Sequence, residues 1–257
     1  MGGRKPKSNI GDMNELEIKI GGTSFKMIYV EGGKYIMGAQ NYDSNNYNYD
    51  SNAYPDEDPI NAVDIKSFYI GRVPVTQMLW KKVMGYNPGA GKSLFKKSEN
   101  YPVDCVSWED SLEFIARINY ITQKAFRLPT ESEWEYAAKG GNKSKGYLYS
   151  GSNEIDEVGW CKNNGEAGLQ KVMSKKPNEL GIYDMSGNVW EWCRDIYGHY
   201  DSNEKNTFAN RLKGDDRVMR GGSWRSDAIY CRTTMRNSAN PSLNLIGVGL
   251  RLALDDF

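Results

Sequence analysis

Three helix starts, each marked by a side chain that can cap a helix, most constrain the fold of this chain. Thr76 precedes QMLWKKVMG. Ser107 and Thr130 each have an acidic residue three positions on, Asp110 and Glu133, which is the pattern of a capping box. All three starts lie before residue 140, so the chain combines a few short helices with a long remainder of strands and loops.

Apolar residues recur at helical spacing in the second and third of these segments. We expect both faces to pack into the core rather than to bind a cofactor. The predicted inward residues are Trp108, Leu112, Ile115 and Ile118 or Asn119 in the second helix, and Trp134, Ala137 and Ala138 in the third.

Short strands are predicted on both sides of the helices. SFKMIYVEGGKYIMG predicts a hairpin that turns at Gly32 and Gly33, and VDIKSFYIG and the C-terminal VGLRLAL each predict one strand. Trp190 and Trp192 point to one face if NVWEWCRD is a strand. Residues 39–59 are polar and rich in Tyr, Asn and Ser, which predicts a long surface loop. With 27 glycines and 17 tyrosines, the expected fold is loop-rich.

Composition excludes several classes of function. The 33 basic residues balance 33 acidic ones, which argues against nucleic acid as a partner, and no apolar run is long enough to span a membrane. The four cysteines form no C-x-x-C pair, so we expect buried thiols, with a single disulfide left open. The one histidine, His199, lies in a loop-like stretch, and we expect its side chain to be exposed to solvent.

The N-terminus has basic residues but no apolar stretch behind them, so it is no secretory signal. We expect residues 1–20 to be a disordered tail or a non-native remnant, and residues 21–257 to be one monomeric domain. The protein would then be cytoplasmic, or displayed through another component.

Several motifs in a fixed order resemble the formylglycine-generating-enzyme/sulfatase-modifying-factor family. They are EGGKYIMG, FRLPTESEWEYAA, GNVWEW, RGGSW and GLRL, within residues 25–254. The resemblance implies an α+β fold of the C-type-lectin-like kind, with short antiparallel strands and few helices, which agrees with the pattern of elements above.

The family's oxidases convert a substrate cysteine to formylglycine with a copper ion, held by two cysteines that follow a GGS-aromatic motif. Here the second position matches Cys231 and the first falls on Ser226. An alcohol is a poor ligand for Cu(I), which prefers thiolates. We therefore predict a protein that is not an enzyme. An oxidase with altered metal ligation, with Cys231 as its catalytic residue, stays open, as does a purely structural or regulatory domain.

Members of this family also bind structural calcium near the motif matched by GNVWEW. The resemblance therefore raises Asn188 and Glu191 as calcium ligands. The alternative from the residues alone is that Asn188 caps a turn and that Glu191 pairs with Arg220 or Arg251.

Another branch of the family, the variable proteins of diversity-generating retroelements, carries a diversified segment at its C-terminal end. Residues 222–252 match that segment here. Its framework residues are Cys231, Arg232, Arg236, Asn237, Pro241, Gly249, Arg251 and Leu252. The resemblance implies a ligand-binding surface, for a protein or cell-surface ligand, made of Trp224, Arg225, Ser226, Asp227, Ile229, Tyr230, Met235, Ser238, Ala239, Ser242, Leu243, Leu245 and Ile246.

Overall fold

The computed structural model describes residues 14–89, 100–165, 168–200 and 216–256. Its strands are β1 Glu15–Ile20, β2 Thr23–Val30, β3 Gly33–Met37, β4 Asn61–Ile65, β5 Phe68–Gly71, β6 Trp190–Ile196, β7 Arg217–Arg220, β8 Arg236–Ala239, β9 Val248–Leu250 and β10 Ala253–Asp255. Its helices are α1 Gln77–Met84, α2 Trp108–Thr122, α3 Glu131–Ala138 and α4 Ile155–Val158, with short 3-10 turns η1 Pro55–Glu57, η2 Gly141–Lys143 and η3 Ala228–Cys231. The predicted α+β class is confirmed.

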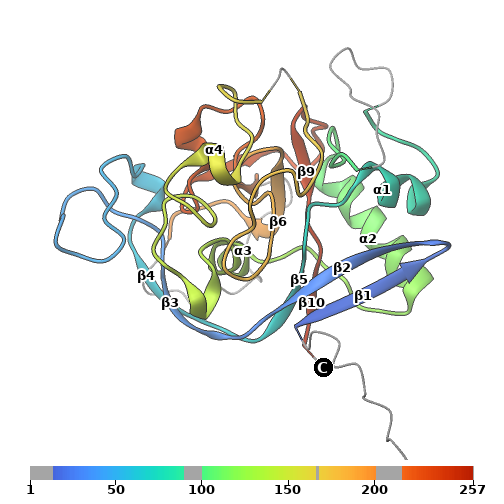
Figure 1. Ribbon diagram of the computed structural model, residues 1–257, viewed down its shortest axis with the longest axis horizontal. Helices are drawn as coiled ribbons and strands as arrows, with labels where there is room; N and C mark the ends of the chain where they lie inside the picture. Colours follow the sequence, from blue (N-terminus) through green and yellow to red (C-terminus); the bar gives the residue numbers. More distant parts are fainter. Residues whose placement is uncertain (1–13, 90–99, 166–167, 201–215, 257) are drawn as a thin grey trace, which may run out of the picture.

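The strands form three small sheets (Figure 1). One is antiparallel with the order β1-β2-β5-β10. The second is the pair β3-β4. The third has the order β8-β7-β6-β9, in which only β6 and β9 run parallel. Among the described residues no helix has the length and apolar character needed to cross a membrane.

The core lies on both faces of the first sheet, because successive strand residues point to opposite sides. Met27 packs in one apolar cluster with Trp80 of α1 and Phe114 of α2, whose rings stack with centroids 5.0 Å apart. Its neighbour Ile28 packs in a second cluster with Trp134 of α3. The first sheet therefore separates α1 and α2 from α3.

All three predicted helices are confirmed, with their caps. The Thr76 hydroxyl accepts the Leu79 N–H at 3.2 Å, and Ser107 and Thr130 form capping boxes. The predicted face of α2 was wrong at Leu112, which is 41% exposed. The buried row runs through Ser111, Phe114, Ile115 and Ile118 instead, and Leu112 lies one position, or about 100°, off it.

The predicted hairpin at Gly32 and Gly33 was wrong, although both of its strands exist. β2 pairs with β1 and β5, whereas β3 pairs with β4 in another sheet. Neither glycine has the positive φ that a tight hairpin turn requires. A Cβ on Gly32 would lie 2.4 Å from the carbonyl oxygen of Ile65, so this glycine serves a close approach of two backbones.

Two other predicted strands are each divided between sheets. VDIKSFYIG forms β4 and β5, which separate at Lys66 and Ser67. VGLRLAL forms β9 and β10, which separate at Arg251 and Leu252. The strand-like pattern of each segment does not reveal this change of partner strand. In VGLRLAL every residue is buried on both sides of the change. In VDIKSFYIG buried residues lie among partly exposed and exposed ones on both sides.

The predicted tail of residues 1–20 was too long. Glu15–Ile20 forms β1 and pairs along its whole length with β2, and Ile18 and Ile20 are buried. The rest of the predicted tail, residues 1–13, lies outside the described residues.

Candidate binding surface

The C-terminal segment, residues 222–252, leaves β7 through a glycine bend, forms η3 and β8, and returns through β9. Gly221 and Gly222 have φ of 97° and 73°, in the left-handed region that favours glycine. A Cβ on Gly222 would lie 2.5 Å from Sγ of Cys231 and 2.8 Å from the carbonyl oxygen of Tyr230. Glycine therefore lets the bend pass close against η3.

Two buried framework arginines fix the segment to distant parts of the fold. Arg232 donates to Glu57 at 2.6 Å and to Asp50 at 2.7 Å. Arg236 donates to both carboxylate oxygens of Glu131, the first residue of α3, at 2.6 and 2.9 Å. Burial alone would lower the pKa of Arg236, but the Glu131 carboxylate raises it, so the guanidinium stays charged.

Two further buried arginines connect the same region to α3 and β6. Arg220, on β7, pairs with Glu135 of α3 and donates to the carbonyl oxygen of Thr234 at 2.6 Å. Arg251 donates to Glu191 at 2.7 and 2.8 Å. A buried pair of this kind fixes geometry because either charge alone would be costly to bury.

Most of the side chains between the framework residues reach solvent. Leu243 is 48% exposed and Ile246 40%. The exposed members are Arg225, Asp227, Ser242, Leu243 and Ile246, and the partly exposed ones are Ser226, Ile229, Tyr230, Ser238, Ala239 and Leu245. The framework is buried except for Asn237, which is exposed, and Pro241, which is partly exposed.

Trp224 and Met235 were wrongly predicted to contribute contact area. Each is only 7% exposed. Trp224 packs with Leu169 and Val189, and Met235 belongs to the main core. An aromatic or a methionine in an irregular segment is often a core residue, and the sequence pattern does not separate the two cases.

The loop after β8 is anchored through its backbone. The carbonyl oxygen of Pro241 accepts the N–H groups of Trp108 and Glu109 at 3.0 and 3.3 Å, at the start of α2. The N–H of Gly247 donates to Asp104 at 3.0 Å. Leu243 and Ile246, between these anchors, are thus exposed on a loop held at both ends.

The alternative predicted for Glu191 is confirmed. Its carboxylate accepts bonds from Arg251 and from the indole N–H of Trp134 at 2.7 Å. Asn188 donates to Asp184 in its own turn, and it donates to and accepts from the backbone of Gln170 in another loop. The guanidinium of Arg251 already neutralises Glu191, so this pair is a poor calcium site.

The contact between the loop of residues 39–59 and the C-terminal segment was not predicted. Tyr54 stacks on Tyr230 with centroids 6.2 Å apart and 17° between the planes, and Asp50 and Glu57 hold Arg232. The acidic and tyrosine-rich composition was visible, but nothing in the sequence pairs an acid with an arginine some 180 positions away.

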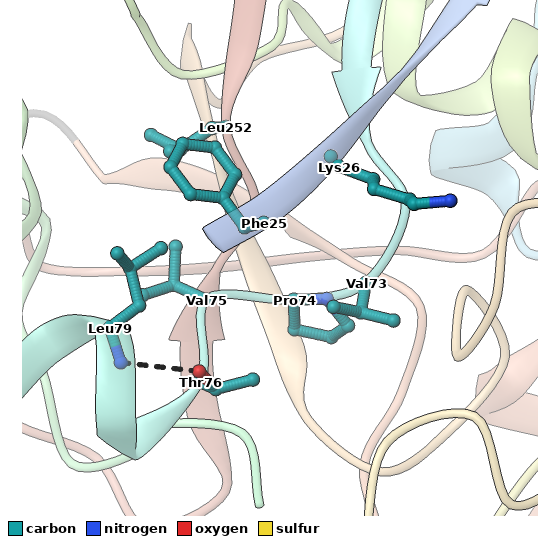
Figure 2. A pocket seen from close by; sticks show the side chains of 9 residues that line it. Phe25, Lys26, Val73, Pro74, Val75, Thr76, Leu79 and Leu252 are labelled. Carbon is teal, nitrogen blue, oxygen red and sulfur yellow. Dashed lines mark hydrogen bonds between the residues drawn. The ribbon is translucent and has the colours of Figure 1, made fainter. Parts of the chain in front are cut away.

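Two hollows, each lined in part by a framework residue, are weaker candidates. One is apolar and lies between β2 and the start of α1, where Phe25, Val73, Pro74 and Leu252 surround it and the Thr76 hydroxyl is occupied by the N–H of Leu79 (Figure 2). Its lining offers little that could orient a ligand.

The second hollow is polar and is lined in part by Glu131, Asp195, His199 and Arg236. His199 is exposed, as predicted. Burial, together with the charge of Glu131, raises the pKa of Asp195 to about 7. The N–H of Glu131 donates to Asp195 at 2.7 Å, so these acids serve the start of α3 and the Arg236 pair.

Residues 18–256 match the sulfatase-modifying factor enzyme 1-like domain. The chain belongs to this family. A curated relative, the chaperone protein LppX of Paenibacillus barcinonensis, is 33% identical over 248 residues, which cover 77% of this chain and 78% of that protein. The formylglycine-generating enzyme of Mus musculus is 34% identical over 199 residues. That match covers 68% of this chain and about half, 51%, of the mouse enzyme.

A similar solved structure is variable protein 1 of Treponema denticola. The two superpose with a TM-score of 0.80 at 26% identity, over 94% of this chain and 99% of the other. The predicted fold, and the predicted resemblance to variable proteins of this family, are thus confirmed.

The residues at the family's copper position do not fit a Cu(I) ion. All four cysteines are buried free thiols, as expected. Burial, with smaller effects from Cys161 and Asp227, raises the pKa of the Cys231 thiol, which disfavours the thiolate that a metal needs. The Ser226 hydroxyl accepts the N–H of Ser223 at 3.1 Å and serves the local turn.

Proposed function

We propose that this chain is the ligand-binding variable protein of a diversity-generating retroelement, and that residues 222–252 display its diversified surface. The observation that carries the proposal is that this segment combines buried framework residues with solvent-exposed residues between them. Arg232 and Arg236 are buried and paired, whereas the predicted contact residues other than Trp224 and Met235 reach solvent. Exposed side chains such as Arg225, Asp227 and Ser242 can be exchanged at a cost within about 0.5 kcal/mol, so this part of the surface can vary while the fold stays fixed.

The chemistry of the exposed residues suits contact with a protein. Tyr230 offers a large ring with few rotatable bonds, and Leu243 and Ile246 add apolar area. Arg225 and Asp227 offer charges of both signs for polar contacts at the rim. The balanced charge of the chain gives no support for nucleic acid as the partner.

The likeness to variable protein 1 of Treponema denticola supports the proposal, because it extends over 94% of this chain. Ser226, at the first of the two positions where the family's oxidases have cysteine, supports a protein that is not an enzyme.

A second candidate is a formylglycine-generating oxidase, which the 34% identity to the mouse enzyme favours. It would bind Cu(I) tightly, convert a cysteine peptide to the aldehyde, and lose both properties in Cys231→Ala. We expect neither property. Tight Cu(I) binding and peptide oxidation that Cys231→Ala abolishes would establish the oxidase instead.

The binding capacity of the segment can be tested with a displayed library. The eleven positions that remain after Trp224 and Met235 are removed from the predicted thirteen would be randomised: Arg225, Ser226, Asp227, Ile229, Tyr230, Ser238, Ala239, Ser242, Leu243, Leu245 and Ile246. A control library of the same size would randomise positions on the solvent side of α2, among them Leu112 and Tyr120, which are 41% and 82% exposed.

Both libraries would be selected against lysozyme, a basic protein, and serum albumin, an acidic one. We expect folded binders with Kd of about 1 μM or better from the segment library and few or none from the α2 library. Equal yields from the two libraries, or none from the segment library, would contradict the proposal and favour a structural domain.

A further inference from the structure

The loop between β3 and β4 places three large aromatic side chains in solvent. Tyr42, Tyr47 and Tyr49 are 71%, 75% and 43% exposed. Single exposed aromatic side chains are common, but several within one short loop are typical of a surface that binds a partner. Figure 1 shows this loop projecting from one side of the molecule, beyond β3 and β4.

The loop is held in one shape by its own hydrogen bonds. The Gln40 side chain accepts the N–H groups of Tyr42 and Asp43 at 3.0 and 2.8 Å. Asn48, at a positive φ of 55°, donates to the carbonyl oxygens of Ile36 and Gly38 at 2.6 and 2.8 Å. Tyrosines on a backbone fixed in this way lose little further freedom when they bind.

Two framework arginines hold this loop beside the C-terminal segment, and of the interleaved residues Tyr230 adds a ring contact with Tyr54. Arg232 pairs with Asp50 and Glu57, and Arg236 donates to the carbonyl oxygen of Asp56 at 2.7 Å. A change at an interleaved position leaves both attachments intact. The loop would therefore accompany every version of the segment in the same place.

The charge of the loop is one-sided. Residues 39–59 contain four aspartates, one glutamate and no lysine or arginine. Arg232 neutralises Asp50 and Glu57. Within the described part of the chain, Asp43, Asp56 and Asp58 have no ion pair. Carboxylates among exposed tyrosine rings attract lysine and arginine, whose cations also favour an aromatic face.

We propose that the loop of residues 39–59 is a constant second half of the binding surface, and that it binds protein surfaces that present lysine or arginine. This inference rests on the proposed function, because the loop is defined by its position beside the diversified segment. The segment would supply the part of recognition that changes, and Tyr42, Tyr47 and Tyr49 the part that does not.

The test uses the segment-library binders. In each lysozyme binder, Tyr42, Tyr47 and Tyr49 are replaced together by serine. We expect Kd for lysozyme to rise about tenfold or more, since exposed tyrosines at an interface commonly contribute that much. Tyr120→Ser on α2, where the ring is 82% exposed, is the matched control and should leave Kd unchanged. Melting temperatures of all variants report that the fold is intact.

The outcomes separate this inference from the proposed function. If binders arise and the triple variant keeps their Kd for lysozyme, the loop is not part of the surface while the function stands. If the triple variant weakens binding to albumin as much as binding to lysozyme, the preference for basic surfaces is refuted. If the segment library yields no binders to either protein, the function fails, and the inference fails with it.

Discussion

The buried clamp at Arg232 gives the sharpest test of how the framework holds the surface. The Arg232 guanidinium is 1% exposed and donates to Glu57 at 2.6 and 2.9 Å, to Asp50 at 2.7 Å, and to the carbonyl oxygen of Ile229 at 3.0 Å. Glu57 itself is fully buried. Arg232→Ala would therefore leave a buried carboxylate without its cation.

The size of the effect follows from that geometry. Breaking a buried ion pair by removing one partner costs about 3–5 kcal/mol. A chain of this size loses about 2–4 °C of melting temperature per kcal/mol. Together these give a fall of roughly 6–20 °C for Arg232→Ala.

The assay is urea denaturation and calorimetry on a double-mutant cycle with Arg232→Ala, Glu57→Gln and the double variant. We expect the double variant to lose about 1–3 kcal/mol less than the sum of the single variants, because the two groups contact each other. Arg117→Ala is the matched control. It breaks an exposed pair with Glu113 on α2, with both side chains about half exposed, and should cost about 0.5 kcal/mol or less. A cost for Arg232→Ala no larger than that of Arg117→Ala would refute the reasoning.

Two further predictions concern the surroundings of the segment. The pKa of Asp195 is raised to about 7 by burial and by Glu131, above its ordinary value of about 3.9. The folded state then binds the proton more tightly, and the free energy of unfolding falls as pH rises from about 4 to about 7. Asp195→Asn keeps an acceptor for the N–H of Glu131. In urea denaturation, the free energy of unfolding of this variant minus that of the parent should therefore be larger at pH 8 than at pH 4.5. The same difference in free energy at both pH values would contradict this. Gly222→Ala should destabilise the fold more than Gly181→Ala. Both glycines have a positive φ, but an added Cβ would clash with neighbouring atoms at Gly222 and would have nothing within 4 Å at Gly181. We expect about 1–2 kcal/mol for Gly181→Ala from backbone strain alone, and equal losses at the two positions would show that the contact with Cys231 does not matter.

The parts of the fold that local sequence determines were predictable. Helix starts depend on a cap and a residue three positions on, so Thr76, Ser107 and Thr130 identified α1, α2 and α3 correctly. Sheet partners depend on contacts between distant residues. For this reason Gly32 and Gly33 suggested a hairpin where the chain in fact moves from one sheet to another.

The candidate surface divides in the same way. The order of motifs located the segment and its framework, because those residues stand at fixed spacings. Whether an apolar residue of this segment faces solvent depends on what packs against it. The sequence therefore predicted exposure wrongly for Trp224 and Met235, which are buried, and correctly for Leu243 and Ile246. The pairing of Arg232 with Glu57 joins residues 175 positions apart, and local spacing carries no information about it.

The central claim is that residues 222–252 carry a diversified surface on a constant framework. Deep sequencing of codons 39–59 and 222–252 across a population of the source organism tests it most directly. We expect variation concentrated at exposed or partly exposed positions such as Arg225, Tyr230 and Leu243, with Arg232 and Arg236 fixed and with the codons of the loop at 39–59 constant. A uniform sequence through the segment, or variation spread equally over buried and exposed positions, would contradict the account.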